Sequence, residues 1–146
     1  MNRKIRHYSI FLLWALCWPV NVNAANTPSS ESIVLGFVAA FNRHDVDQML
    51  EMVSEDIHWY SVDGRNIGVE TTGKQQLQRA MELYFSGIKS RSTLLSIHGE
   101  GNYVVTMEKS RSLTNLYSQP QCSAATYQLD NGKIKAVWYF PAVICD

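Results

Sequence analysis

Apolar side chains recur every three or four positions from Ile33 onward, which is the period of an α-helix. The pattern predicts a helix over about 31–42, and Ser30 precedes it as the expected N-cap. Asp45 and the glutamine three positions later form a capping-box pattern. A second, short helix is therefore expected to run from Asp45 to about Ser54.

The most regular helical pattern lies in the middle of the chain. Thr72 and Gln75 repeat the capping-box pattern, and apolar residues over 77–88 fall at offsets of 0, 3, 4, 7, 8 and 11. We expect a third helix here, with Thr72 as its N-cap and with Leu77 and Met81 pointing inward.

The remaining segments have the pattern of strands. Aromatic and β-branched residues over 56–62 predict a first strand, and a loop is expected over 63–72. Four further strands are expected at 93–98, 102–112, 122–129 and 133–140. Because three helices precede this run of strands, we expect an α+β domain whose helices pack on one face of a curved antiparallel sheet.

The N-terminal segment has the pattern of an export signal. Arg3, Lys4 and Arg6 precede an apolar run over 10–20, and small and polar residues follow up to Ala24. The run has about half of the roughly 20 residues that a membrane-spanning helix needs. The sequence therefore predicts a cleaved leader and no stable membrane insertion.

The domain boundaries follow from this leader. We expect a signal peptide over 1–24, a flexible lead over 25–30 and one domain over 31–146, exported to the periplasm or the extracellular space. A lipoprotein signal with Cys17 as the acylated residue is the alternative, but Leu16 is bulky where such signals have a small residue.

Composition and charge exclude several kinds of partner. The chain is 46% hydrophobic and 18% charged, as in an ordinary globular domain. Its 13 basic and 13 acidic side chains balance to a net charge of 0. Because no basic field exists to attract a polyanion, nucleic acid is not an expected partner.

Cys122 and Cys145 remain once the leader is removed, and an even number of cysteines in an exported protein favours a disulfide. However, a hairpin around Asn131 and Gly132 would place Cys122 opposite Pro141. Cys145 would then lie about 13 Å further along a straight strand, whereas a disulfide needs Cα atoms within about 7 Å. The bond requires the chain to fold back after Pro141, and two buried thiols are the alternative.

Five short stretches, taken together and in order, carry a family resemblance. They are 37–42, 45–47, 54–59, 73–88 and 130–134. In these stretches the chain resembles the NTF2-like superfamily and, within it, the SnoaL-like domains. The resemblance covers essentially the whole chain after the leader. It implies a cone-shaped α+β domain with a pocket at its wide end, and commonly a homodimer formed through the sheet.

The superfamily includes isomerases, cyclases, epoxide hydrolases, dehydratases and proteins that only bind or assemble, so the fold does not give the function. Isomerase-like members need a carboxylate base, with a tyrosine and a protonated aspartate as oxyanion donors. The resemblance places Ser61 at the position of the base, Phe37 at that of the tyrosine and Ala125 at that of the aspartate. None of the three groups is present, which speaks against steroid-isomerase chemistry. The sequence also lacks the complete set of paired aspartates with an arginine that epoxide hydrolases carry.

The same resemblance implies that aromatic and hydroxyl side chains line the pocket. The expected ligand-binding residues are Phe37, Trp59, Ser61, Met81, Tyr84, Tyr127 and Tyr139. Such a lining suits a small, mostly apolar molecule that is oriented by two or three hydrogen bonds. The alternative is that these side chains simply fill the core.

One residue is singled out for catalysis. Asp63 is the carboxylate nearest to the lost base position, and buried beside aromatic rings it could act as a general base. Asp63 and Gly64 also form a turn signal, so an ordinary turn residue is the alternative. On a later strand Glu108 and Arg111 lie three positions apart, so only one of them can face the pocket. The sequence leaves open which one does.

No metal or cofactor is expected. His44, His58 and His98 are not spaced as a ligand cluster. The sequence lacks the motifs of serine hydrolases, phosphate-binding loops and zinc proteases.

The final strand is apolar on both of its faces, which a half-exposed strand would not be. We expect Val137 and Tyr139 to face the pocket and Trp138 and Phe140 to lie on the outer sheet face. Two large aromatic side chains in one exposed patch mark an interface, so a homodimer through Trp138 and Phe140 is predicted. Coverage of these rings by 113–121 in a monomer is the alternative to this dimer. The alternative to ligand binding is an interaction or assembly module that uses Trp138 and Phe140 on this outer face and has a filled pocket.

Export is tested by N-terminal sequencing of the secreted protein. We expect the mature chain to begin at Ala25, because the small residues before it form the cleavage signal. A mature product that still contains Trp14 would contradict the prediction.

Overall fold

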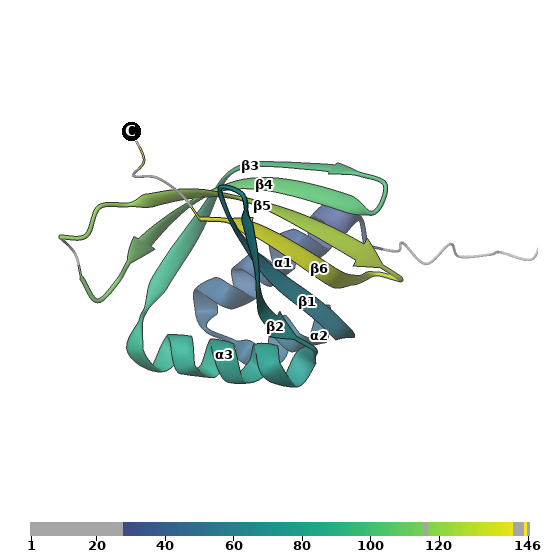
Figure 1. Ribbon diagram of the computed structural model, residues 1–146, viewed down its shortest axis with the longest axis horizontal. Helices are drawn as coiled ribbons and strands as arrows, with labels where there is room; N and C mark the ends of the chain where they lie inside the picture. Colours follow the sequence, from purple (N-terminus) through teal and green to yellow (C-terminus); the bar gives the residue numbers. More distant parts are fainter. Residues whose placement is uncertain (1–27, 116, 142–144, 146) are drawn as a thin grey trace, which may run out of the picture.

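The computed structural model describes residues 28–115, 117–141 and 145. In this part of the chain three helices lie against one face of a six-stranded sheet (Figure 1). The helices are α1 (Ser30–Arg43), α2 (Val46–Glu51) and α3 (Lys74–Gly87). The strands are β1 (Val53–Asp63), β2 (Asn66–Thr72), β3 (Ser90–Glu100), β4 (Tyr103–Ser112), β5 (Gln121–Asp130) and β6 (Lys133–Phe140).

The α+β fold class expected from the sequence is confirmed. None of the described helices has the length and hydropathy needed to cross a membrane. The predicted signal peptide over 1–24 lies outside the described residues.

Polar side chains determine where α1 and α2 begin. Ser29 is the N-cap of α1, one residue before the expected Ser30, and its Oγ accepts a hydrogen bond from the Ser32 N–H over 3.2 Å. Asp45 caps α2 as predicted and accepts from the Gln48 N–H over 3.0 Å. Both caps satisfy backbone donors that the first turn of a helix leaves free.

α3 begins differently from the expectation, which made Thr72 its N-cap. The N-cap is Gly73, whose φ of 80° lies in the region that favours glycine, and it makes no side-chain capping bond. The Gly73 N–H instead donates to the Ile57 carbonyl of β1 over 2.7 Å. The start of α3 is therefore held both by the sheet and by Gln76 of the helix, whose Oε1 accepts from the Thr72 N–H over 2.9 Å.

The strand order is β2-β1-β6-β5-β4-β3. Four neighbouring pairs are antiparallel, but β1 and β6 run parallel, so the sheet is mixed. The expectation of antiparallel pairing throughout is wrong for this pair. α3 and four strands separate β1 from β6 along the chain, so no hairpin turn imposes an antiparallel arrangement on them.

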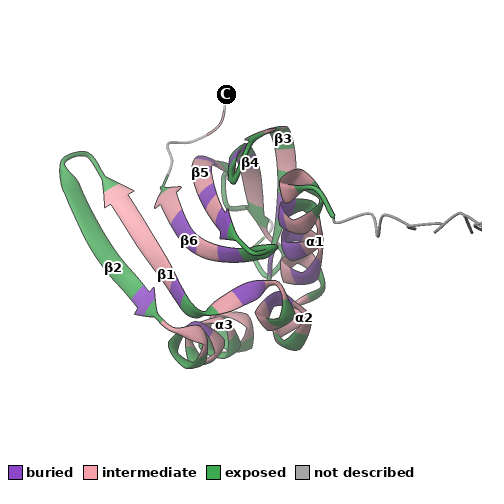
Figure 2. Cartoon of the chain, turned by 90° about the vertical axis from the view of Figure 1, so that its right-hand side faces the viewer, coloured by how far each residue is buried: buried purple, intermediate pink, exposed green. Residues whose placement is uncertain are grey.

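The expected loop over 63–72 is also wrong, because most of it forms β2. Asp63 pairs with Asn66 across a two-residue turn that contains Gly64, with a φ of 57°. β2 is an edge strand and only Thr71 is buried in it, as Figure 2 shows by its almost wholly exposed surface. Ile67 and Val69 do alternate with polar residues, but the stretch is short and Gly68 interrupts it, so the sequence signal for a strand is weak.

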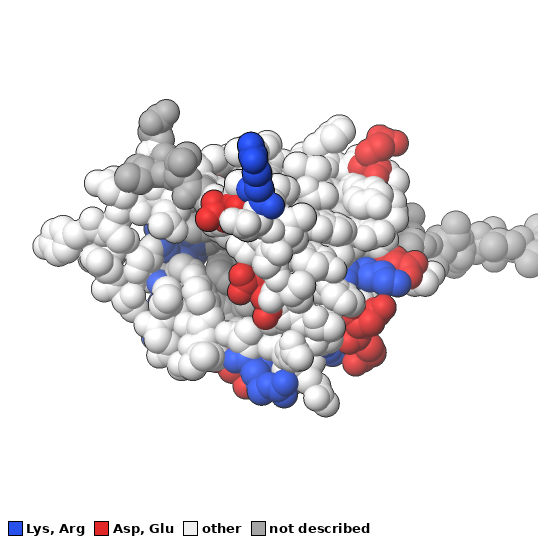
Figure 3. All heavy atoms as spheres, in the orientation of Figure 1, with Lys and Arg blue, Asp and Glu red and all other residues white. Residues whose placement is uncertain are grey.

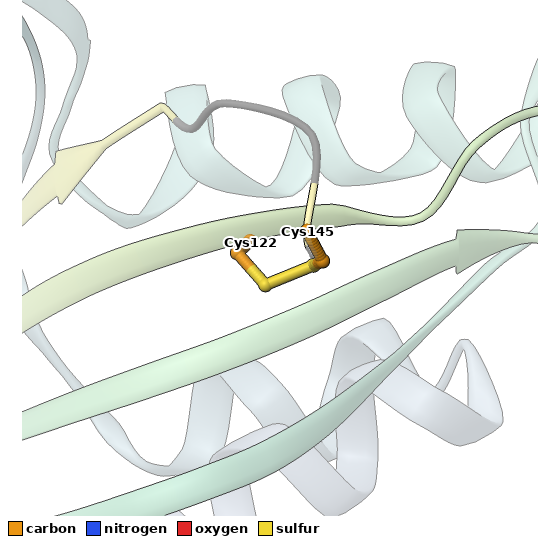
Figure 4. Close-up of a disulfide and its surroundings, with 2 residues drawn as sticks. All are labelled: Cys122 and Cys145. Carbon is orange, nitrogen blue, oxygen red and sulfur yellow. A yellow bond between two sulfur atoms is a disulfide. The ribbon is translucent and has the colours of Figure 1, made fainter.

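Cys122 and Cys145 form a disulfide, with their Cα atoms 5.1 Å apart (Figure 4). The Cys145 N–H donates to the Pro120 carbonyl over 3.3 Å, so the end of the chain has returned to the start of β5. This is the fold-back arrangement that the bond requires. The predicted hairpin register holds at Leu129 opposite Ile134, after which a bulge shifts it by one residue.

The core lies between the helices and the inner face of the sheet. Phe37 of α1, Leu77 of α3 and Val137 of β6 are each at most 2% exposed. Every second residue of β5 from Ser123 to Leu129 is buried, and this alternation is visible as bands in Figure 2. Alternate side chains of the sheet therefore meet the helices, as the period of a strand requires.

The burial of Leu77 gives a test of how α3 is packed. Leu77→Ala should lower the free energy of unfolding by about 2 to 5 kcal/mol, because it removes a buried side chain and leaves a cavity. Leu83 lies on the same helix and is 76% exposed, so Leu83→Ala serves as the matched control, with an expected change within about 0.5 kcal/mol. Urea unfolding measures both. Similar losses in the two variants would contradict this packing.

Candidate functional site

A cavity of about 380 Å³ lies between the helices and the inner face of the sheet. It is lined by α1 and α3 on one side and by residues of all six strands on the other. Its volume falls in the range of about 300 to 1,000 Å³ that is usual for small-molecule pockets. The side chains of this region therefore leave open space instead of filling it.

All the residues expected to bind a ligand line this one cavity. They are Phe37, Trp59, Ser61, Met81, Tyr84, Tyr127 and Tyr139. The sequence did not predict several other lining residues, among them Glu70 and Thr71 of β2, Ser92 of β3 and Ser110 of β4. The sequence predicts a loop where β2 lies, and it does not decide which residues of β4 point toward the cavity.

Aromatic rings form much of the cavity wall. Phe37 lies 6.2 Å from Trp59 and 6.3 Å from Tyr127 between ring centroids. Phe41 lies 6.1 Å from Tyr84 in the same way. Tilted and edge-to-face contacts at these distances are favourable for aromatic pairs, so the rings support one another while parts of them border the cavity.

Glu108 is the buried carboxylate of this site. Its side chain lines the cavity although the residue is only 6% exposed. Ser92 Oγ donates to Oε2 over 2.7 Å, while Thr106 Oγ1 and the Tyr127 hydroxyl donate to Oε1 over 2.8 and 3.1 Å. Three hydroxyl groups from three neighbouring strands therefore solvate the carboxylate in place of water.

The structure answers the question that the sequence left open between Glu108 and Arg111. Glu108 faces the cavity, whereas Arg111 is exposed. The sequence could not decide, because Val104 and Val105 are adjacent and Met107 makes the outer face as apolar as the inner one. Val104, Thr106 and Glu108 occupy every second position of β4 and share its inner face. Tyr103, Val105 and Met107 occupy the other positions and form an equally regular pattern.

The tyrosines around Glu108 remain neutral hydroxyl groups. Burial raises the pKa of Tyr127 well above its usual value, and the nearby negative charge of Glu108 raises it further. Burial also raises the pKa of Tyr139, and interaction with the Ser123 hydroxyl reverses part of this rise. At physiological pH both side chains can therefore donate a hydrogen bond.

Asp63 is not part of this site. It is exposed, lies next to the turn between β1 and β2, and is not among the residues that line the cavity, which favours the turn alternative. The chain reverses immediately after Asp63, so its side chain stays at the rim in water. The positions where isomerase-like members carry their ionisable groups hold Phe37 and Ser61 at the cavity and a buried Ala125.

The histidines do not come together. Among the described residues no group of three or more His, Cys, Asp or Glu side chains is placed to hold a metal ion. His44 contacts the Ser90 carbonyl through Nε2 over 3.3 Å, and His58 stacks on Tyr60 at 5.9 Å between ring centroids. His98 is exposed on β3.

The outer face of the sheet carries a second group of aromatic residues. Trp138 stacks on Tyr60 with 5.6 Å between ring centroids, and Phe140 is 40% exposed. Val137 is buried and Tyr139 lines the cavity, so these two residues of β6 face inward as expected. The exposed Tyr103, Val105 and Met107 of β4 lie on this side of the sheet, two strands away from β6.

Charge is spread without a dominant sign on the face shown in Figure 3, where Lys and Arg side chains are scattered among Asp and Glu side chains. Lys135 lies 3.6 Å from Asp56 and 3.7 Å from Asp130. Lys74 pairs with Glu55 at 2.7 Å. These exposed ion pairs contribute little to stability.

The chain belongs to the SnoaL-like domain family, because the model of that family matches residues 34–137, which is most of the sequence. This confirms the family resemblance drawn from the short stretches of sequence. A search of curated proteins finds no match.

Solved structures with the NTF2-like fold agree with this membership. An NTF2-like protein of unknown function from Cytophaga hutchinsonii superposes with a TM-score of 0.62 at 16% identity, over 77% of this chain and 89% of that one. An LEH-like epoxide hydrolase from M. tuberculosis superposes with a TM-score of 0.67 at 14% identity, over 77% of this chain and 81% of that one. An NTF-2 like protein of unknown function from Burkholderia xenovorans superposes with a TM-score of 0.65 at 15% identity, over 80% of this chain and 85% of that one. At such low identity the likeness shows the fold alone.

Proposed function

We propose that this SnoaL-like domain binds one small, mostly apolar molecule in the cavity between its helices and sheet. The observation that carries the proposal is an open space of about 380 Å³ with aromatic walls and a buried carboxylate. Apolar walls with a few placed polar groups are the usual composition of a ligand site. An assembly module with a filled pocket is less consistent with this space.

A bound molecule would be oriented by a few polar groups. The Tyr139 hydroxyl and Ser61 line the cavity beside the rings, and Glu108 offers its carboxylate from the sheet. Two or three hydrogen bonds to such groups fix the direction of a ligand that dispersion holds in place.

Acid–base catalysis is a second candidate function, and Glu108 is the observation that favours it. A buried carboxylate at a cavity is the group that an isomerase-, cyclase- or hydrolase-like reaction needs as its base. Hydrogen bonds from Ser92, Thr106 and Tyr127 hold this carboxylate in place at the cavity wall.

Export fits the disulfide between Cys122 and Cys145. Such bonds persist in oxidising compartments and are rare in the cytosol, so the bond supports a location in the periplasm or outside the cell. The proposed ligand would then be a molecule met in the cell envelope or in the surroundings of the cell.

We further propose that two copies pack sheet to sheet across the outer face. Trp138 and Phe140 lie at the centre of this proposal, and the exposed apolar residues of β4 lie on the same side of the sheet, two strands away. Exposed apolar patches of this kind mark interfaces, and an obligate dimer would bury on the order of 1,500 Å² or more. The concave side would remain free to hold the ligand.

Binding in the cavity is tested by a variant that fills it. Ala80→Phe should weaken binding of the neutral dye N-phenyl-1-naphthylamine at least tenfold, because Ala80 lines the cavity. Gln75→Phe adds the same ring at an exposed position of α3 and should leave the affinity unchanged. Dye fluorescence measures both. Equal affinities in the two variants, or no saturable binding to the unaltered protein, would contradict the proposal.

The dimer is tested by sedimentation equilibrium of the mature protein. The unaltered chain should run at the dimer mass at micromolar concentration, and Trp138→Glu should run as a monomer, because it places a charge in the apolar interface. Gln75→Glu, which adds a charge on α3, should remain dimeric. A monomeric unaltered protein, or a Trp138→Glu variant that folds and stays dimeric, would rule out this interface.

A further inference from the structure

The charge of the cavity lining is one-sided. Its ionisable carboxylates are Glu108 in the wall and Glu70 on β2, and no Lys, Arg or His is among the described residues that line it. The tyrosines of the lining include Tyr127 and Tyr139, whose raised pKa values keep them neutral. An ion entering this space therefore meets negative charge only.

Glu108 lacks the counter-charge that a buried carboxylate normally has. Within the described part of the chain no Lys, Arg or His nitrogen lies within 4.0 Å of it. An unpaired charge held away from water is costly, and hydroxyl donors offset this cost only in part. A positive group brought into the cavity by a ligand would complete the pairing.

The hydrogen bonds of Glu108 leave room for one more donor. A carboxylate has about four acceptor sites, two on each oxygen. Oε1 accepts from Thr106 and Tyr127, whereas Oε2 accepts only from Ser92. One acceptor site on Oε2 is therefore not used by these three hydroxyl groups, and Glu108 borders the cavity.

The aromatic walls favour the same kind of ligand. Trp59, Tyr84, Tyr127 and Tyr139 all line the cavity with Glu108. The face of an aromatic ring attracts a cation, most strongly when water is excluded, and tryptophan does so best. The rings also provide the apolar surface that the body of a small molecule needs.

We propose that the ligand of this cavity is a small organic cation, a protonated amine with an apolar body, whose N–H donates to Glu108 while its body packs against the aromatic walls. This inference deepens the proposed function and rests on it, because it names the chemical class of the molecule bound. A neutral or anionic molecule of the same shape would leave Glu108 without its counter-charge.

Three probes of one shape and different charge test the inference by calorimetry at low salt. 2-Phenylethylamine is a cation at pH 7, 2-phenylethanol is neutral and 3-phenylpropanoate is an anion. The amine should bind at least tenfold more tightly than the alcohol, and the anion should bind most weakly. Binding of the alcohol as tight as that of the amine would overturn the inference and leave the proposed function standing. Failure of all three probes to bind would defeat both.

Variants assign the preference to Glu108. Glu108→Gln keeps the shape of the side chain but removes its charge, so the ratio of amine to alcohol affinity should fall to about one. Glu100→Gln removes the same charge from an exposed position at the end of β3 and should leave the ratio unchanged. A ratio that survives in Glu108→Gln would overturn the inference. If that variant does not fold, the probe affinities of the unaltered protein decide alone.

Discussion

The carboxylate of Glu108 has to be solvated inside the protein, and this requirement links three strands of the sheet. Ser92 comes from β3, Thr106 and Glu108 from β4 and Tyr127 from β5. Because each hydroxyl must reach the carboxylate, a slip in the register of any of these strands would leave a buried charge short of a donor. The polar cluster therefore constrains the wall of the cavity as well as its chemistry.

The aromatic walls and the polar cluster depend on each other. Tyr127 belongs to both, since its ring contacts Phe37 and its hydroxyl donates to Glu108. The contact with Phe37 holds the ring of Tyr127, and the hydrogen bond to Glu108 fixes the direction of its hydroxyl. A site of this kind is organised before a ligand arrives, which lowers the entropic cost of binding.

Much of the fold was predictable because its signals are local. The period of α1 and α3, the cap at Asp45 and the turn at Asn131 and Gly132 depend on residues close together in sequence. The family resemblance then placed the cavity lining, including Trp59 and Tyr139. The helices, the cap and the turn required no knowledge of which distant segments meet, whereas the cavity lining was inferred from the fold that the resemblance implies.

The parts that could not be predicted depend on long-range pairing. β2 has no buried face and only a short alternation that Gly68 interrupts. The parallel contact of β1 with β6 brings together segments that α3 and four strands separate. Glu108 was ambiguous because β4 is apolar on its outer face, where Val105 and Met107 are exposed. The apolar outer face of β4, which supports a dimer, is thus also the reason why the sequence did not identify Glu108 as facing inward.

The proposed ligand site is organised around Glu108, which borders the cavity. A crystal structure of the mature protein purified from its native source, with no ligand added, tests this most directly. We expect density of a non-protein molecule between Trp59 and Tyr139, with a donor atom within hydrogen-bond distance of Glu108. A cavity closed by the neighbouring side chains, with Glu108 turned out to solvent, would contradict the account.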